Sequence, residues 1–123
     1  MPSDVPPKLQ GINHLNIRVR DPARSARFYE DALGMKVAFS EMPRAIFLTS
    51  GKDLLTLART RRRPKSGGMH FGFGVESKSE YDKWKSWLQR EHVKITSERE
   101  EESGGGMYFK DPDGYTIEIF YET

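Results

Sequence analysis

Two histidines occupy matching positions in two similar segments of the chain, and their placement suggests chemistry. His14 lies in Gly11–Val19 and His70 lies in Gly67–Val75, and one offset of 56 residues aligns the two segments. A single histidine in a strand usually has a hydrogen-bonded structural role, but two of only three histidines at matched positions indicate a function. Two imidazoles, a carboxylate and open coordination positions are typical of non-haem Fe(II) sites and also suit Mn(II), Ni(II) or Zn(II).

A carboxylate and a tyrosine near the end of the sequence complete this candidate set. Glu118 stands between two isoleucines, where an acid is costly to bury without a partner. An ion pair with one of the arginines is the alternative to a metal-ligand role. Tyr108 falls on the same face as Glu118 by alternation and is the candidate catalytic residue, although tyrosine also simply favours strands. The sequence therefore predicts His14, His70 and Glu118 as metal ligands.

The elements that position these residues follow the same order twice along the chain. Period-two alternation predicts opening strands over 12–19 and 69–75, with each histidine opposite the apolar face. Asp21-Pro22 predicts a helix that runs to about Leu33, and Ser77 predicts the start of a second helix. Further strands are expected over 35–40, 45–49, 53–59, 93–98, 106–110 and 115–121. The fold class is α+β with paired βαβββ modules, and the helices leave the four candidate side chains on the opposite face.

The chain divides into an arm and one domain. Residues 1–10 are expected to form a flexible N-terminal arm because the first eight include three prolines. Residues 11–122 are expected to form a single domain made of modules 11–59 and 67–122, which a basic linker joins.

Glycines mark two places of interest. Residues 97–106 combine four acids with Gly104–Gly106, which indicates a hinge-like loop able to fold over a site; a solvated surface loop is the alternative. Gly72 and Gly74 lie on the His70 face, where missing side chains are expected to leave open volume.

Composition excludes several classes of protein. Hydrophobic residues make up 36% and charged residues 31%, and the formal net charge is +2, too balanced to indicate a nucleic-acid partner. No apolar run approaches the length of a membrane span. The absence of cysteine excludes disulfides, thiolate metal sites and a cysteine nucleophile. We expect a cytoplasmic protein without nucleic-acid or membrane partners.

Two runs of sequence resemble a known superfamily. Gly11–Val19 with Asp21–Met35, and Tyr108–Phe120, are similar to the vicinal oxygen chelate proteins, which include glyoxalases, bleomycin resistance proteins, extradiol dioxygenases and fosfomycin resistance proteins. The resemblance extends from about residue 10 to 121. It implies a glyoxalase/dioxygenase-like fold whose strands curl around a metal site, and a homodimer in which modules from two chains complete each site. It also implies that the ligands are His14, His70 and Glu118 and that Tyr108 approaches the substrate or the metal.

The chain departs from each named activity of that superfamily. Glyoxalase I-like enzymes add a fourth protein ligand late in the first module, where this chain has Leu54, Leu55 or Thr56. Fosfomycin thiol transferases carry a basic cluster that includes an arginine beyond the final acid, whereas this chain ends Phe-Tyr-Glu-Thr. Extradiol dioxygenases add a histidine, and the matching positions here lie near Leu55 and Arg99.

The expected function is a divalent-metal-dependent enzyme that acts on a small molecule with vicinal oxygens. A dioxygenase-like or lyase-like reaction is favoured because three ligands leave open coordination positions, and the metal is Fe2+, Mn2+, Ni2+ or Zn2+. The alternative is a metal-free small-molecule or drug-sequestering binding protein of the bleomycin-resistance type, with aromatic area from Tyr108, Tyr115 and Phe120. A purely structural domain is the third possibility.

Overall fold

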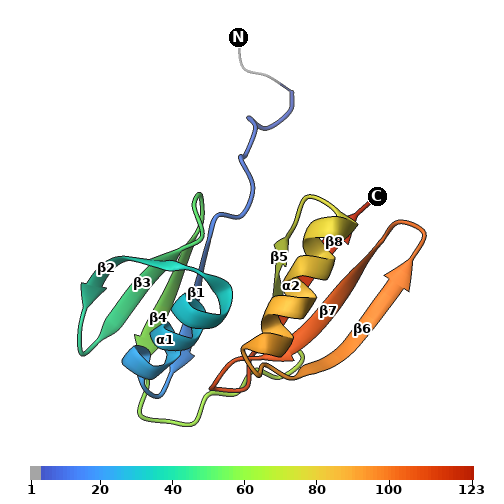
Figure 1. Ribbon diagram of the computed structural model, residues 1–123. Coiled ribbons are helices and arrows are strands. Elements are labelled where there is room, and N and C mark those ends of the chain that lie inside the picture. Colours follow the sequence, from blue (N-terminus) through green and yellow to red (C-terminus); the bar gives the residue numbers. More distant parts are fainter. Residues whose placement is uncertain (1–3) are drawn as a thin grey trace.

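Two four-stranded sheets, each covered by one helix, form the computed structural model, which describes residues 4–123 (Figure 1). Both helices lie on the same side of the molecule in Figure 1, so each sheet has one helix-free face. The elements are β1 (His14–Val19), α1 (Pro22–Leu33), β2 (Lys36–Glu41), β3 (Ala45–Thr49), β4 (Leu54–Arg59), β5 (His70–Gly74), α2 (Lys78–Arg90), β6 (Ile95–Glu101), β7 (Gly104–Lys110) and β8 (Thr116–Glu122).

The two sheets have the same topology. Their strand orders are β1-β4-β3-β2 and β5-β8-β7-β6, and the first strand of each pairs in parallel with the last. The other neighbours pair antiparallel. The predicted βαβββ repeat is therefore confirmed.

The helix ends follow from local sequence. The Asp21 side chain accepts a hydrogen bond from the Arg24 backbone N–H at 3.2 Å, and Gly34 ends α1 with a left-handed φ of 69°. The Ser77 hydroxyl caps α2 by accepting from the Glu80 N–H at 3.2 Å. Side-chain capping of free N–H groups and a left-handed glycine at the end are the expected boundary signals.

The expected hinge-like loop over residues 97–106 is wrong, because most of this segment forms the β6–β7 hairpin. Glu101 pairs with Gly104, which leaves a two-residue turn. Gly104 to Gly106 are buried in β7. A Cβ on Gly105 would lie 2.9 Å from the Tyr121 ring and 3.0 Å from the Arg99 carbonyl oxygen. The glycines therefore permit close packing rather than a hinge.

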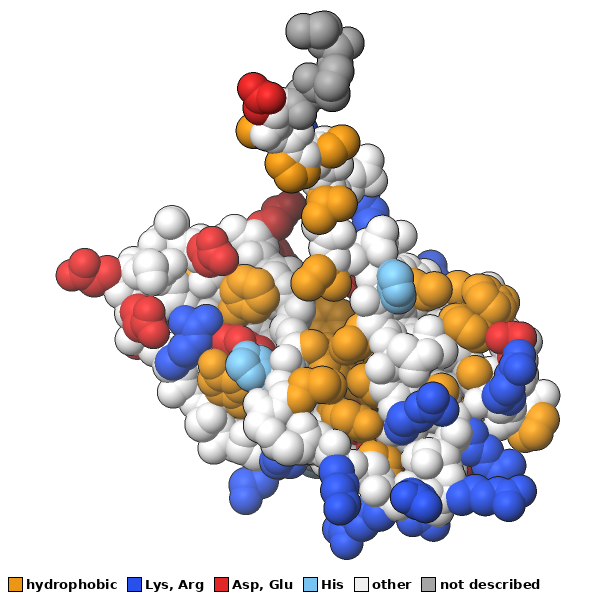
Figure 2. Space-filling model, turned by 180° about the vertical axis from the view of Figure 1, so that it is seen from behind, with side chains coloured by type: hydrophobic (Ala, Val, Ile, Leu, Met, Phe, Trp, Pro, Cys, Tyr) orange, Lys and Arg blue, Asp and Glu red, His pale blue; other side chains and the backbone are white. Residues whose placement is uncertain are grey.

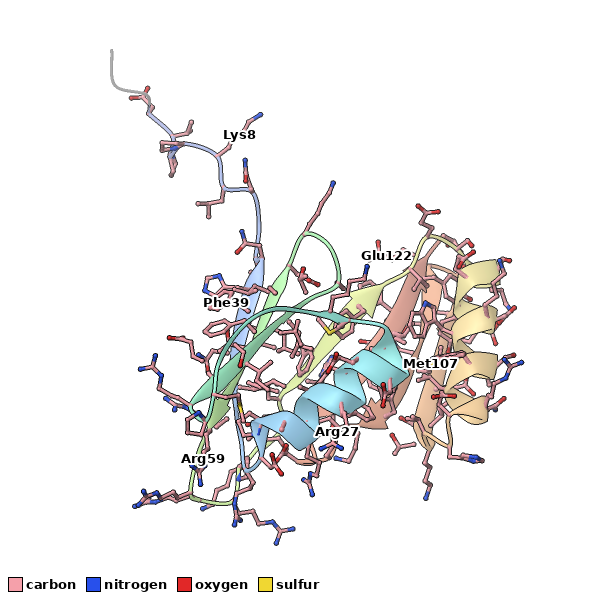
Figure 3. All side chains as sticks on the ribbon, turned by 60° about the vertical axis from the view of Figure 1, so that its left-hand side comes forward. Lys8, Arg27, Phe39, Arg59, Met107 and Glu122 are labelled. Carbon is pink, nitrogen blue, oxygen red and sulfur yellow. The ribbon has the colours of Figure 1, made fainter. Side chains whose placement is uncertain are left out.

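The core lies between each helix and its sheet. Leu48 and Leu57 are fully buried in the first module, and Leu88 and Ile117 are fully buried in the second. Figure 3 shows Met107 in the interior and Arg27 pointing outward from α1. Phe39, on the exposed strand β2, stacks on Phe47 with ring centroids 4.1 Å apart.

A turn between β7 and β8, residues 111–115, ties the two modules together. The Tyr29 hydroxyl of α1 donates to Asp111 Oδ2 at 2.6 Å, and the Ser25 hydroxyl donates to Asp113 Oδ2 at 2.7 Å. The Tyr115 hydroxyl donates to the Arg18 carbonyl oxygen at 2.7 Å. We call this segment the clasp turn. Burial raises the pKa of Asp111 despite the opposing hydrogen bonds from Tyr29, Tyr115 and Asp113.

The N-terminal segment runs away from both sheets in Figure 1. Residues 4–10 are exposed, and residues 1–3 of the expected arm lie outside the described residues. No helix within residues 4–123 is long and apolar enough to cross a membrane.

Candidate metal centre

Three neighbouring strands bring part of the predicted site together. In the register of β5, β8 and β7, Gly72 pairs with Glu118 and Glu118 pairs with Tyr108. His70 precedes Gly72 by two residues and therefore lies on the same face. Sheet pairing in the second module thus gathers His70, Tyr108 and Glu118.

The geometry of this group suits metal binding. His70 Nε2 lies 3.6 Å from Glu118 Oε1, and the His70 and Tyr108 rings meet edge to face at 5.7 Å. Two donors that are each about 2.1 Å from one ion can lie up to roughly 4 Å apart, so both can bind the same ion. Glu118 is 7% exposed, whereas His70 is open to solvent.

Arg99 is a site residue that the sequence reasoning did not select. Its Nε and Nη2 atoms both donate to Glu118 Oε2, at 3.1 and 2.8 Å. The Tyr108 hydroxyl and then the Glu118 carboxylate raise the pKa of the Arg99 guanidinium. The sequence signal was the alternative reading of Glu118 as an arginine partner, but spacing alone did not identify which arginine.

Glycines shape the strands around the carboxylate. A Cβ on Gly106 would overlap Glu118 Oε2 and lie 3.2 Å from Arg99 Nε. At Gly72 and Gly74 the Phe120 ring occupies part of the expected open volume, 3.3 and 3.4 Å from where a Cβ would stand, and Gly72 also lines a hollow. These glycines make room for an aromatic side chain.

His14 lies in the other module. It is exposed, its Nδ1 is 3.1 Å from the Asn13 side-chain oxygen, and it lines a hollow of about 350 Å³ between the modules. We call this hollow the seam pocket; Leu15, Leu55 and Phe71 also line it. Figure 2 shows histidine side chains at two separate places on the helix-free side, with hydrophobic side chains between them.

A single chain does not gather the three predicted ligands. Among residues 4–123 no group of three or more histidine, aspartate or glutamate side chains could hold one ion. His70 and Glu118 fit as two ligands, since the Arg99 hydrogen bonds go to Glu118 Oε2 while Oε1 faces His70. Within residues 4–123 of one chain, this group therefore offers two protein ligands.

The first module carries no acid at the position equivalent to Glu118. Asn16 pairs with Thr56 in the register of β1 and β4, two residues beyond His14, just as Gly72 pairs with Glu118 two residues beyond His70. Thr56 is buried. Of the three residues considered for a fourth ligand, the register thus selects Thr56, a neutral hydroxyl.

Known proteins with similar sequences are named as transferases. The chain is 31% identical over 117 residues to the metallothiol transferase FosB of Staphylococcus saprophyticus, covering 90% of this chain and 76% of that protein. It is 28% identical over 116 residues to the glutathione transferase FosA of Serratia marcescens, covering 90% and 80%. The name metallothiol transferase given to FosB confirms the predicted divalent-metal cofactor.

Similarity to solved structures confirms the fold class. A lactoylglutathione lyase from Agrobacterium tumefaciens superposes with a TM-score of 0.82 at 19% identity, over 92% of this chain and 94% of that one. The family model described as Glyoxalase/Bleomycin resistance protein/Dioxygenase superfamily matches residues 11–119. With its repeated βαβββ modules and this match over nearly its whole length, the chain belongs to the Glyoxalase/Bleomycin resistance protein/Dioxygenase superfamily.

Proposed function

We propose that the chain is a divalent-metal-dependent enzyme that binds a small molecule through two neighbouring oxygen atoms. One observation carries the proposal: His70 Nε2 and Glu118 Oε1 lie 3.6 Å apart on the helix-free side of the sheet. Imidazole nitrogen and carboxylate oxygen suit Fe2+, Mn2+, Ni2+ and Zn2+ alike.

The third ligand in this proposal is His14 of a second copy. His14 and His70 are both exposed in one chain but are not grouped with Glu118 around one point. A two-fold symmetric homodimer would bring the first module of each copy to the second module of the other. The proposed protein is a cytoplasmic homodimer without nucleic-acid or membrane partners.

For the reaction we favour attack by an external thiol on the bound substrate. The relatives are named thiol and glutathione transferases, and this chain has no cysteine, so the thiol would be a second substrate. In such a transfer an S–C bond forms, a C–O bond of the substrate breaks, and the thiol proton goes to the released oxygen. The dioxygenase-like or lyase-like reaction remains the competing class.

The side chains of the site have distinct tasks in this chemistry. A divalent ion would act as a Lewis acid on the substrate oxygens. Tyr108, in edge contact with His70, would donate a hydrogen bond to a substrate oxygen or supply its proton. Phe120, against Gly72 and Gly74, would exclude water from one edge of the site.

The test is equilibrium titration of metal-stripped protein with Fe(II), Mn(II), Ni(II) and Zn(II). We expect close to one ion per chain. His70→Ala should weaken metal binding more than about 100-fold, since even the loss of a residue that only supports a ligand lowers metal affinity 10- to 100-fold. His92→Ala is the matched control, because His92 is exposed in the turn after α2. Failure of the folded wild-type protein to bind any of the four ions would overturn the proposal.

The reaction class needs its own assay. Metal-loaded protein with glutathione and fosfomycin as probes should consume thiol, and His70→Ala should abolish the consumption. Oxygen uptake by Fe(II)-loaded protein with a vicinal diol, without thiol consumption, would favour the dioxygenase class instead.

The seam pocket favours a second candidate, a metal-free binder of small apolar molecules. Its lining is largely apolar, with Leu15, Leu55 and Phe73 among its residues, and such lining is typical of ligand pockets. In this case His70→Ala would leave ligand affinity unchanged, whereas Leu55→Asp would abolish it. Binding of hydrophobic fluorescent probes to both variants separates the two functions.

A further inference from the structure

The Arg99 guanidinium is held in place on two sides. Its Nε and Nη2 donate to Glu118 Oε2, and its Nη1 lies 3.7 Å from Glu101 Oε1 on the same strand. The Arg99 side chain is 37% exposed, whereas that of Glu118 is 9% exposed. A partly exposed arginine thus reaches across the sheet to a buried carboxylate.

Gly106 makes this reach possible. Arg99 pairs directly with Gly106 across β6 and β7, while Glu118 pairs with Tyr108, so the ion pair runs diagonally over the Gly106 backbone. Any side chain at 106 would occupy the space of Glu118 Oε2. Because Gly106 has no Cβ, the Glu118 carboxylate and the Arg99 guanidinium can meet directly above β7.

The distribution of hydrogen bonds over the carboxylate is uneven. A guanidinium fork bound to both oxygens would compete with a metal ion for the carboxylate. Here both donors meet at Oε2, and Oε1 is left facing His70 Nε2. The ion pair and a metal ligand can therefore coexist on one side chain.

We propose that Arg99 is a positioning residue of the metal centre, which holds Glu118 Oε2 so that Oε1 faces His70 and the ion. The inference rests on the proposed function, because it concerns a ligand of the proposed ion. Glu118 then binds the ion through one oxygen while the arginine keeps the other. Partners of this kind orient ligands, and their loss typically weakens metal binding 10- to 100-fold.

The experiment compares metal affinity in variants of the metal-stripped protein, titrated with Mn(II) and Ni(II). Arg99→Met should raise the dissociation constant about 10- to 100-fold. Arg99→Lys should give an intermediate value, because an ammonium can donate to Oε2 but lacks the planar fork. Arg44→Met is the matched control, since it removes an exposed arginine–glutamate pair at Glu41, and it should bind as wild type does.

Gly106→Ala tests the same geometry with Arg99 still present. The new Cβ should displace the carboxylate and weaken binding, and Arg99→Met/Gly106→Ala should weaken it by less than the product of the two single effects, because both act through one carboxylate. Melting of the metal-free variants, followed by circular dichroism, identifies any that fail to fold. If Arg99→Met fails to fold, Arg99→Lys and Gly106→Ala decide the outcome.

The outcomes separate this inference from the proposed function. If wild type binds the ion, His70→Ala does not, and folded Arg99→Met binds as tightly as wild type or more tightly, the positioning role is overturned and the metal centre stands. If wild type binds no ion, both fail.

Discussion

Glu118 has a different neighbour on each carboxylate oxygen, with Arg99 on Oε2 and His70 beside Oε1. From sequence, an arginine partner and a metal-ligand role were alternatives for this residue. The geometry allows both, because the arginine uses Oε2 and the proposed ion would use Oε1. At a carboxylate, pairing with an arginine is therefore weak evidence against metal binding.

Tyr108 provides a prediction at the residue scale. Because it contacts His70 through its ring rather than holding the proposed ion, Tyr108→Phe should leave metal affinity within about threefold of wild type and lower turnover about 100-fold or more. Metal titration and steady-state kinetics with the thiol probe measure the two effects. Tyr81→Phe, on α2 and bonded to Glu98, is the control and should keep full turnover.

Alternation predicted which face each candidate residue occupies, but not how the faces meet. It put His70, Tyr108 and Glu118 together correctly, because they lie on paired strands of one sheet. It could not place His14 relative to them, since period two fixes a direction within one strand and says nothing about the arrangement of two sheets. Arg99 was missed because its contact runs diagonally across a glycine.

At the scale of elements, the helices and the strands expected over 93–98 and 106–110 were predictable, whereas the extension of those two strands through residues 99–105 into the β6–β7 hairpin was not. Asp21 and Ser77 act through their nearest neighbours, so local sequence suffices to identify the caps. Strand β6 is at the edge of its sheet and mostly exposed, so its run of acids lacks the apolar alternation that marks a strand. The glycines of β7 are needed because residues of β8 and β6, which are distant in sequence, lie where their Cβ atoms would stand.

Gly105→Ala distinguishes a packed strand from a hinge. The added methyl would meet the Tyr121 ring and the Arg99 backbone, so the variant should lose about 1–3 kcal/mol of unfolding free energy. Gly68→Ala, where a Cβ meets no atom within 4 Å, should stay within about 0.5 kcal/mol of wild type. Urea denaturation measures both, and equal stability of the two variants would contradict close packing at Gly105.

The contact between α1 and the clasp turn should depend on pH. Burial raises the pKa of Asp111, so its proton favours the folded state at acid pH, and that contribution is lost as pH rises through the pKa of the folded state. The Tyr29 hydroxyl opposes this by stabilising the carboxylate. Tyr29→Phe should therefore lower the free energy of unfolding by about 2 kcal/mol near pH 7. The loss should be smaller below about pH 4, where the carboxyl is protonated.

Denaturation of wild type and Tyr29→Phe at both pH values measures this difference. Phe28→Leu, a change at the neighbouring half-buried ring, is the control, and its cost should not vary with pH. A pH-independent cost for Tyr29→Phe would show that its hydroxyl does not act through Asp111.

The proposed homodimer makes a quantitative prediction for the whole molecule. His14→Ala and His70→Ala should each destroy metal binding. After the two variants are unfolded and refolded together, each mixed dimer would hold one intact site, so about one quarter of all sites should recover if subunits assort at random. Metal titration of the mixture measures the recovery. No recovery, with mixed dimers verified by mass spectrometry, would place both histidines in one chain's site.

The clasp turn has a practical consequence for dividing the chain. It joins the modules through Tyr29, Ser25 and Arg18, while residues 61–63 of the linker between β4 and β5 are exposed and form no strand. A break in the backbone there would leave the bonds between the halves intact. The two halves, each fused to one of two test proteins, would serve as a split reporter. Their reassembly would report that the two test proteins bind each other.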